Sequence, residues 1–349
     1  MAPNLNNGNL VILGDVCHDL PLHATTVDHE SGAKLGGAVS FSSAVASILG
    51  VPTHAFTMAP QTHPRWRDFQ QYGHAFGFQT TNLALSHTLG GDKITSFANT
   101  YVGGKRTQDH PSKTQQIGME QLPFILPHLN SESQVLIGTV TSDEVSLDLL
   151  RALHGTGVPI SMTMQGYFRR VHPDSKRVTE GPFANWRHVA SLVDAIYLSD
   201  EDLRFPDGDY LLRDLVHTCP QVVLTRGGNG VSIYQNRSRT DIPSVPLTPE
   251  QIGTGASFTG AGETFTTAKM AYTMQGLTPI EAATKAHLFA ACKIHFDPKN
   301  PKIDGVPSIP TPQEFEAWTQ SPQVLKYVRD LGMPHLLQKE GILTLSERR

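Results

Sequence analysis

The sequence predicts an α/β fold with a doubly wound, mostly parallel sheet, and two observations support this prediction. First, short apolar segments of strand length recur along the chain, at residues 9–13, 53–58, 135–139, 159–164, 195–198 and 222–225. Second, helical stretches separate these segments. Strands that alternate with helices are typical of a parallel sheet that carries helices on both faces.

The helical stretches have the expected periodicity and stop signals. Residues 39–49 carry apolar side chains at helical spacing and lead into Gly50, and glycine commonly follows the last residue of a helix. Residues 145–154 predict a second helix. Residues 264–274 and 277–296 predict a long helical region late in the chain.

Two segments depart from this alternation. Residues 93–101 have the two-residue period of a strand and lead into Gly103-Gly104, which predicts a half-exposed strand and a turn. From about Asp297 the chain is first rich in proline and then forms short polar helices. We expect one domain over residues 1–320 and a C-terminal helical extension over residues 321–349.

Composition excludes several classes of function. The net charge is −4 and no basic block occurs, so binding to nucleic acid or to an anionic membrane is not expected. No apolar run reaches transmembrane length, and the first residues predict no secretory signal. The chain has an odd number of cysteines, Cys17, Cys219 and Cys292, and they are far apart in sequence. This pattern argues against a disulfide framework and predicts that the protein resides in the reducing cytoplasm. The histidines lack the close spacing of a structural zinc site.

The most informative stretch is Ser257-Phe258-Thr259-Gly260-Ala261-Gly262-Glu263-Thr264-Phe265. Glycines flank Ala261, so the backbone can approach a ligand closely, and a helix is expected to begin here. The N–H groups at a helix N-terminus bind anions. Glu263 suits this positive end and would stand beside a bound anion, where a general base is useful. The alternative is a capped helix after a glycine-rich loop.

A second candidate site follows the first strand, at Gly14-Asp15-Val16-Cys17-His18-Asp19. Ligands of open α/β sheets gather at the carboxyl ends of strands, where Asp15 and Asp19 can accept hydrogen bonds from substrate hydroxyls. An Asx turn and helix cap is the alternative for Asp19. Gly36-Gly37 is either a hinge or close-approach site, or a plain turn.

A third candidate is Thr225-Arg226-Gly227-Gly228-Asn229-Gly230, which lies between the strand at residues 222–225 and the apolar residues 231–234. Its glycines permit positive φ and close contact with a nucleotide. A simple hairpin turn would require them too.

The order of these patterns, from Leu10 to Phe296, resembles the ribokinase, or PfkB, carbohydrate kinase family. This resemblance implies phosphoryl transfer from ATP, with Mg²⁺, to a hydroxyl of a sugar, polyol or nucleoside. It also implies a Rossmann-like sheet with a small β-sheet lid, formed here by about residues 21–34 and 92–106. The segments at residues 17–19 and 165–169 look most like the myo-inositol 3-kinase branch.

The resemblance also implies a role for each matching position. Glu263 stands at the catalytic aspartate of the family, which accepts the proton of the attacking hydroxyl. The anion hole for the transferring phosphate corresponds to Gly260, Ala261 and Gly262. The implied substrate-binding residues are Asp15, Asp19, Gly36, Gly37, Gln165 and Arg169. The implied nucleotide-binding residues are Thr225, Gly227, Gly228, Gly230 and His287.

Three positions depart from the family pattern. Glu263 replaces aspartate, which moves the carboxylate by roughly one ångström while its ordinary pKa stays similar. Ser257 stands where the family has an acid that helps to build a monovalent-cation site. Residues 199–202 stand at an N-x-x-E motif that is linked to magnesium, and Asp202 retains its charge.

Two functions therefore compete. The first is an ATP- and Mg²⁺-dependent kinase for a small polyhydroxylated substrate, with a possible homodimer through the lid. The second is a catalytically silent module that binds a nucleotide or a sugar in a regulatory role, which the altered positions favour. A dinucleotide-dependent dehydrogenase has little support, because no G-x-G-x-x-G motif follows the first strand.

Overall fold

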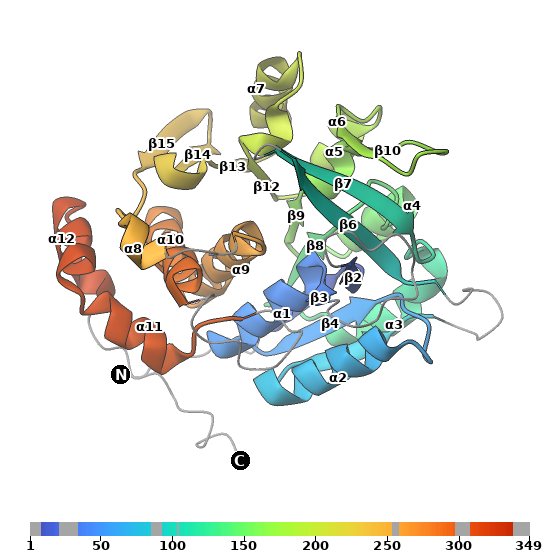
Figure 1. Ribbon diagram of the computed structural model, residues 1–349, viewed down its shortest axis with the longest axis horizontal. Helices are drawn as coiled ribbons and strands as arrows, with labels where there is room; N and C mark the ends of the chain where they lie inside the picture. The colour runs from blue at the N-terminus through green and yellow to red at the C-terminus, as the bar shows by residue number, and fades with distance from the viewer. Residues whose placement is uncertain are drawn as a thin grey trace.

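The computed structural model describes residues 8–20, 34–84, 93–102, 105–252, 258–296 and 308–337. Within these ranges, the central sheet has nine strands in the order β15-β14-β13-β12-β9-β8-β1-β4-β5 (Figure 1). Neighbouring strands from β13 to β5 run parallel, and β14 and β15 extend the sheet antiparallel. The predicted doubly wound, mostly parallel α/β fold is confirmed.

The strands of this sheet are β1 (Leu10–Leu13), β4 (Thr53–Thr57), β5 (Gln79–Asn82), β8 (Gln134–Gly138), β9 (Ile160–Thr163), β12 (Ala195–Ser199), β13 (Gln221–Thr225), β14 (Val231–Gln235) and β15 (Ser238–Ile242). The central strands are mostly buried because both faces of the sheet are covered, and β1 is apolar throughout. In β1, Leu10 and Ile12 point into one hydrophobic core, and Val11 and Leu13 point into the other.

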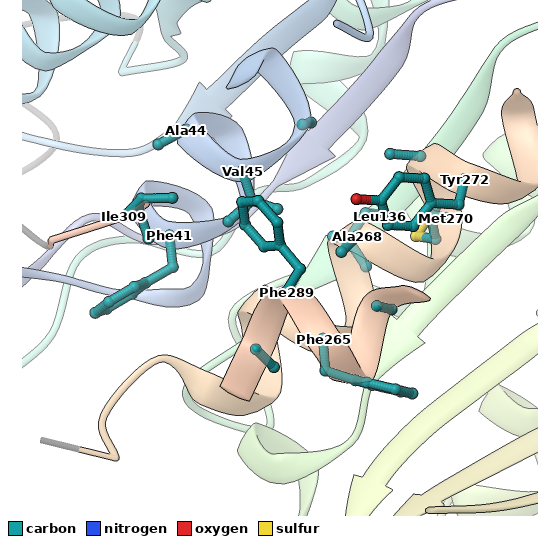
Figure 2. Close-up of a cluster of buried hydrophobic side chains, with 14 of the residues drawn as sticks. Phe41, Ala44, Val45, Leu136, Phe265, Ala268, Met270, Tyr272, Phe289 and Ile309 are labelled. Atoms are coloured by element: carbon teal, nitrogen blue, oxygen red, sulfur yellow. The ribbon is translucent and has the colours of Figure 1, made fainter. Parts of the chain in front are cut away.

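The first core lies between the sheet and six helices: α1 (Ala38–Ile48), α2 (Pro64–Phe76), α9 (Ala261–Met274), α10 (Pro279–Phe296), α11 (Pro312–Thr319) and α12 (Pro322–Asp330). Helices α1, α9 and α10 are buried on most sides, which suits their central position. Figure 2 shows the ring of Phe289 reaching from α10 toward Val45 of α1.

The second core is covered by α3 (Leu122–Ile125), α4 (Leu147–His154), α6 (Trp186–Ala190) and α7 (Gly208–Thr218). Shorter elements complete the described chain: α5 (Gln165–Phe168), α8 (Pro249–Ile252), η1 (Met119–Gln121), η2 (Leu126–His128), η3 (Glu201–Leu203), η4 (Gly227–Asn229) and η5 (Pro334–Leu337). None of the helices in the described ranges is long and apolar enough to cross a membrane.

A separate four-stranded sheet has the order β3-β2-β6-β7 and corresponds to the expected lid. Its strands are β2 (Cys17–Leu20), β3 (Lys34–Gly36), β6 (Thr95–Val102) and β7 (Lys105–Ser112), and β10 (Arg169–Val171) pairs with β11 (Val178–Glu180) nearby. Of the lid segments expected from the sequence, residues 21–33, 92 and 103–104 lie outside the described ranges.

The expectation of a half-exposed strand at residues 93–101 is wrong for its first part. Thr95, Ser96 and Phe97 are all buried. Thr95 reaches back to an aspartate after β1, and the Ser96 hydroxyl is hydrogen-bonded to that of Ser112 on β7. Alternation alone does not reveal such cover on the polar face of a strand.

The C-terminal helices pack on the first core. Val324, Tyr327 and Val328 of α12 are buried there, and the Tyr327 hydroxyl donates to the carbonyl of Pro243 at 2.8 Å. Residues 338–349 lie outside the described ranges. The expected division of the chain at residue 320 stays a prediction.

Candidate active site

The glycine-rich turn opens α9, as the sequence predicts. Gly260 is the N-cap residue, with a φ of 79°, and the helix begins at Ala261. The Ala261 N–H donates to the Phe258 carbonyl at 3.1 Å. By contrast, the N–H groups of Gly260, Gly262 and Glu263 make no hydrogen bond with any described residue. Free N–H donors and the positive end of a helix are the features with which a helix N-terminus can bind an anion, so the predicted anion hole at this turn stays a prediction.

The outer side of this turn is open. A Cβ atom at Gly262 would meet nothing within 4 Å, so a ligand can approach the backbone there. Glu263 is half-buried, and its carboxylate forms no hydrogen bond or ion pair within the described ranges. A carboxylate in this position can accept a proton beside a bound phosphate.

The two glycines before α1, Gly36 and Gly37, make close contacts with residues 14–19, which we call the aspartate segment. A Cβ atom at Gly36 would lie 2.3 Å from Oδ2 of Asp19, because β3 pairs with β2 at this point. Gly37 has a φ of 92°, and a Cβ atom there would lie 2.2 Å from the Asp15 carbonyl oxygen. The position of Gly37 therefore requires glycine, and a side chain at Gly36 would displace the Asp19 carboxylate. Both contacts favour the close-approach interpretation over a plain turn.

Helix α1 connects the segment at residues 14–19 with the glycine-rich turn at residues 260–263. Its N-cap, Gly37, touches Asp15, and Phe41 in its first turn touches Gly260. Residues four apart in a helix are separated by about 6 Å along its axis. Asp15 and the Gly260 turn therefore contact neighbouring parts of one helix, at the edge of the sheet where the parallel strands end.

Asp15 connects the lid with the sheet. Its side chain is fully buried, and Oδ2 accepts hydrogen bonds from the hydroxyls of Thr95 at 2.5 Å and Thr114 at 2.6 Å. Burial raises the pKa of Asp15 to about 6. Oδ1 is buried without a hydrogen-bond partner among the described residues. Direct binding of substrate by Asp15 stays a prediction.

Glu144 is a site residue that the sequence analysis missed. Its buried carboxylate accepts the backbone N–H of Asp15 and, at 2.7 Å, that of Val140. It thereby fastens the loop after β8 to the loop after β1. Burial, and then the nearby Asp15, raise the pKa of Glu144 well above its usual range. The feature of the sequence that could have identified Glu144 is its position as an acidic residue in the loop that follows the apolar strand β8.

Arg169 lies beside the aspartate segment. It is buried, donates from Nη1 to the Val140 carbonyl at 3.2 Å, and lies 5.2 Å from the ring centroid of Phe97 on the lid. Cys17 packs in the same small cluster, and burial and Asp19 raise its thiol pKa. Gln165, also expected at the substrate, is half-buried at the start of α5.

The turn at residues 225–230 connects the antiparallel strands β13 and β14. Gly230 is required for packing, since its Cβ atom would lie 2.1 Å from the Ile242 carbonyl oxygen. At Gly227 and Gly228 a Cβ atom would meet nothing within 4 Å. The hairpin interpretation is therefore right for the connection, and the open glycines leave room for a ligand beside Thr225, the last residue of β13.

The two remaining expected residues lie in separate elements. Asp202 in η3, directly after β12, accepts the Ser199 N–H at 2.7 Å, and burial raises its pKa to about 6. His287 of α10 lies 6.2 Å from Phe265 of α9, measured between ring centroids. Burial lowers its pKa to about 4, and its Nδ1 has no hydrogen-bond partner among the described residues. Ser257 lies outside the described ranges.

No protein-family model matches this chain. The inositol 3-kinase of Arabidopsis thaliana is 22% identical over 294 residues, which are 82% of this chain and 74% of the relative.

Several solved structures share the fold, and two of them carry ligands that bear on function. One is a pyrophosphate-dependent kinase of the ribokinase family in complex with a pyrophosphate analogue and myo-inositol, with a TM-score of 0.68 and 18% identity over 88% of this chain and 99% of the other. The other is A. thaliana ribokinase with ribose and ATP, with a TM-score of 0.61 and 15% identity over 92% and 100%. The resemblance to the ribokinase family is thus confirmed at the level of the fold.

Proposed function

We propose that this protein is a kinase that transfers a phosphoryl group from ATP to a hydroxyl of a small polyol, and that myo-inositol is the first candidate substrate. The observation that carries the proposal is the start of α9. Unpaired N–H groups and a carboxylate without a partner among the described residues occur together there, and α1 connects this turn with the segment that carries Asp19. The inositol 3-kinase relative supports the choice of substrate.

In the proposed reaction, Asp19 accepts hydrogen bonds from substrate hydroxyls and orients them. Glu263 accepts the proton of the attacking substrate hydroxyl. The hydroxyl oxygen forms a bond to the γ-phosphorus of ATP while the bond between that phosphorus and the ADP oxygen breaks. The N–H groups of Gly260 and Gly262 hold the oxygens of the transferring group, where negative charge is concentrated.

Magnesium would be held by the phosphates together with Asp202, which follows β12 at the carboxyl edge of the sheet. Carboxylate and phosphate oxygens are the ligands that Mg²⁺ prefers. When bound, the ion neutralises charge on the phosphate oxygens. The buried Asp202 carboxylate already accepts the Ser199 N–H, so we expect the phosphates to supply most ligands.

The direct test is product formation across a panel of inositols, sugars and nucleosides, with ATP and pyrophosphate as alternative donors. Pyrophosphate is included because a structural relative uses it. Phosphorylated inositol with ATP and Mg²⁺ is the expected product. Product formation with pyrophosphate and none with ATP would show that pyrophosphate is the phosphoryl donor.

The second candidate is a silent binding module, which the replacement of the family aspartate by Glu263 favours. Calorimetric binding of ATP or inositol without product, in wild type and in Glu263→Asp alike, would establish this alternative.

A further inference from the structure

A buried lysine lies directly behind the phosphate-binding turn. Lys293 of α10 is 1% exposed, and its Nζ donates to the carbonyl oxygen of Thr259 at 2.6 Å. Nζ also lies 5.8 Å from the ring centroid of Phe41, the side chain that packs on Gly260. Lys293 and Phe41 therefore support the turn from two different helices.

The contact with Thr259 has a consequence for the next N–H group. The carbonyl of Thr259 and the N–H of Gly260 belong to the same peptide unit, and the described chain contains no cis peptide bond. In a planar trans peptide the C=O and N–H bonds point in opposite directions. Because Lys293 binds the carbonyl, the Gly260 N–H points away from the lysine. This N–H makes no hydrogen bond with any described residue.

The charge of the lysine acts in the same direction. An ammonium group that binds a carbonyl polarises the peptide unit and strengthens its N–H as a donor, and this effect is larger in a buried, low-dielectric environment. The positive charge also adds to that of the α9 N-terminus. Burying an amine is unfavourable unless it is paired, so an apolar side chain would fill this space at lower cost if packing were the only requirement.

We propose that Lys293 is a positioning residue of the phosphate-binding turn. It holds the Thr259–Gly260 peptide with its N–H directed at the phosphate, and its charge strengthens anion binding. This inference rests on the proposed function, because it assumes that the turn binds the transferring phosphate. Lys293 acts through the backbone and does not itself touch the substrate.

A second buried lysine provides a matched control. Lys269 of α9 is 3% exposed and donates to Oε1 of Gln221 at 2.7 Å and to the Tyr197 hydroxyl at 3.2 Å. Gln221 is the first residue of β13, so these contacts lie at the opposite end of that strand from the turn at residues 225–230. Loss of this lysine should destabilise the fold without changing the phosphate site.

The experiment measures the dissociation constants of MgATP, magnesium pyrophosphate and tripolyphosphate by calorimetry, together with binding of myo-inositol. Lys293→Met removes charge and donor, and Lys293→Gln removes only the charge and is the milder variant if methionine prevents folding. Lys293→Met should weaken binding of each phosphate ligand that wild type binds by roughly ten- to a hundredfold, as expected for loss of a charge-assisted contact. Lys293→Gln should lie between Lys293→Met and wild type. Affinity for myo-inositol should stay unchanged.

Lys269→Met should lower the melting temperature and leave phosphate affinity unchanged. Equal loss of phosphate affinity in Lys293→Met and Lys269→Met would show that both lysines only stabilise the fold. Wild-type affinity in both Lys293 variants, or a wild type that binds none of the three phosphate ligands, would also overturn the proposal. If phosphate binding depends on Lys293 but no phosphoryl transfer occurs, the kinase proposal fails and the role of Lys293 stands.

Discussion

The ring of Phe41 occupies the space that any side chain at Gly260 would require. A Cβ atom on Gly260 would lie 2.2 Å from two atoms of this ring, and the φ of 79° is strained for residues other than glycine. The glycine-rich turn at the start of α9 therefore packs on the first turn of α1. A direct contact between α1 and α9 sets its position, in addition to the local preference of glycine.

This contact predicts different outcomes for the two glycines. Gly262→Val should retain the melting temperature and abolish turnover, because its side chain would project into the open side of the turn. Gly260→Ala should cost about 1–3 kcal/mol of unfolding free energy, from the clash with Phe41 and from backbone strain. Thermal unfolding and turnover of both variants test this difference. Unchanged kinetics in Gly262→Val would show that this turn takes no part in catalysis.

Asp19 should contribute to substrate use and hardly to ATP binding. Asp19→Ala removes the carboxylate expected to accept substrate hydroxyls, so KM for the polyol should rise by roughly tenfold or more while the Kd for ATP stays constant. Gly36→Ala is a useful companion, because its methyl group would displace the same carboxylate. Parallel loss of both affinities, accompanied by unfolding, would instead indicate a structural cap.

Glu263 should act as the general base. Glu263→Gln conserves size and removes basicity, so kcat should fall about 10²–10⁴-fold with little change in the Kd for ATP. Glu263→Asp tests whether the site has adapted to the longer side chain. A glutamine variant with wild-type kcat would assign the proton transfer to another group.

Asp202 should make stability depend on pH. Its folded pKa of about 6 lies above the ordinary value of 3.8, so between these values the folded state binds more protons than the unfolded state. Its contribution to stability is therefore greatest below pH 4 and falls as the pH rises toward 6. Relative to Asp202→Asn, wild type should lose roughly 2–3 kcal/mol over this interval. Urea unfolding of both proteins at several pH values measures the difference, and parallel curves would contradict it.

The sequence by itself determined the elements and much of the site. Short apolar runs of strand length located β1, β8 and β13, and the glycines around Ala261 located the start of α9. These features depend on neighbouring residues, whose side-chain period and backbone freedom can be read locally. The order of the motifs was enough to indicate the ribokinase-like fold.

Only the tertiary structure decided which distant residues support that site. Lys293 binds the Thr259 carbonyl across 34 residues, and Glu144 binds the Asp15 N–H across 129. Nothing local distinguishes these side chains from the charged residues that normally lie at a protein surface. Their burial follows from how helices and loops pack around the carboxyl edge of the sheet, where a buried polar group needs a partner from elsewhere in the chain.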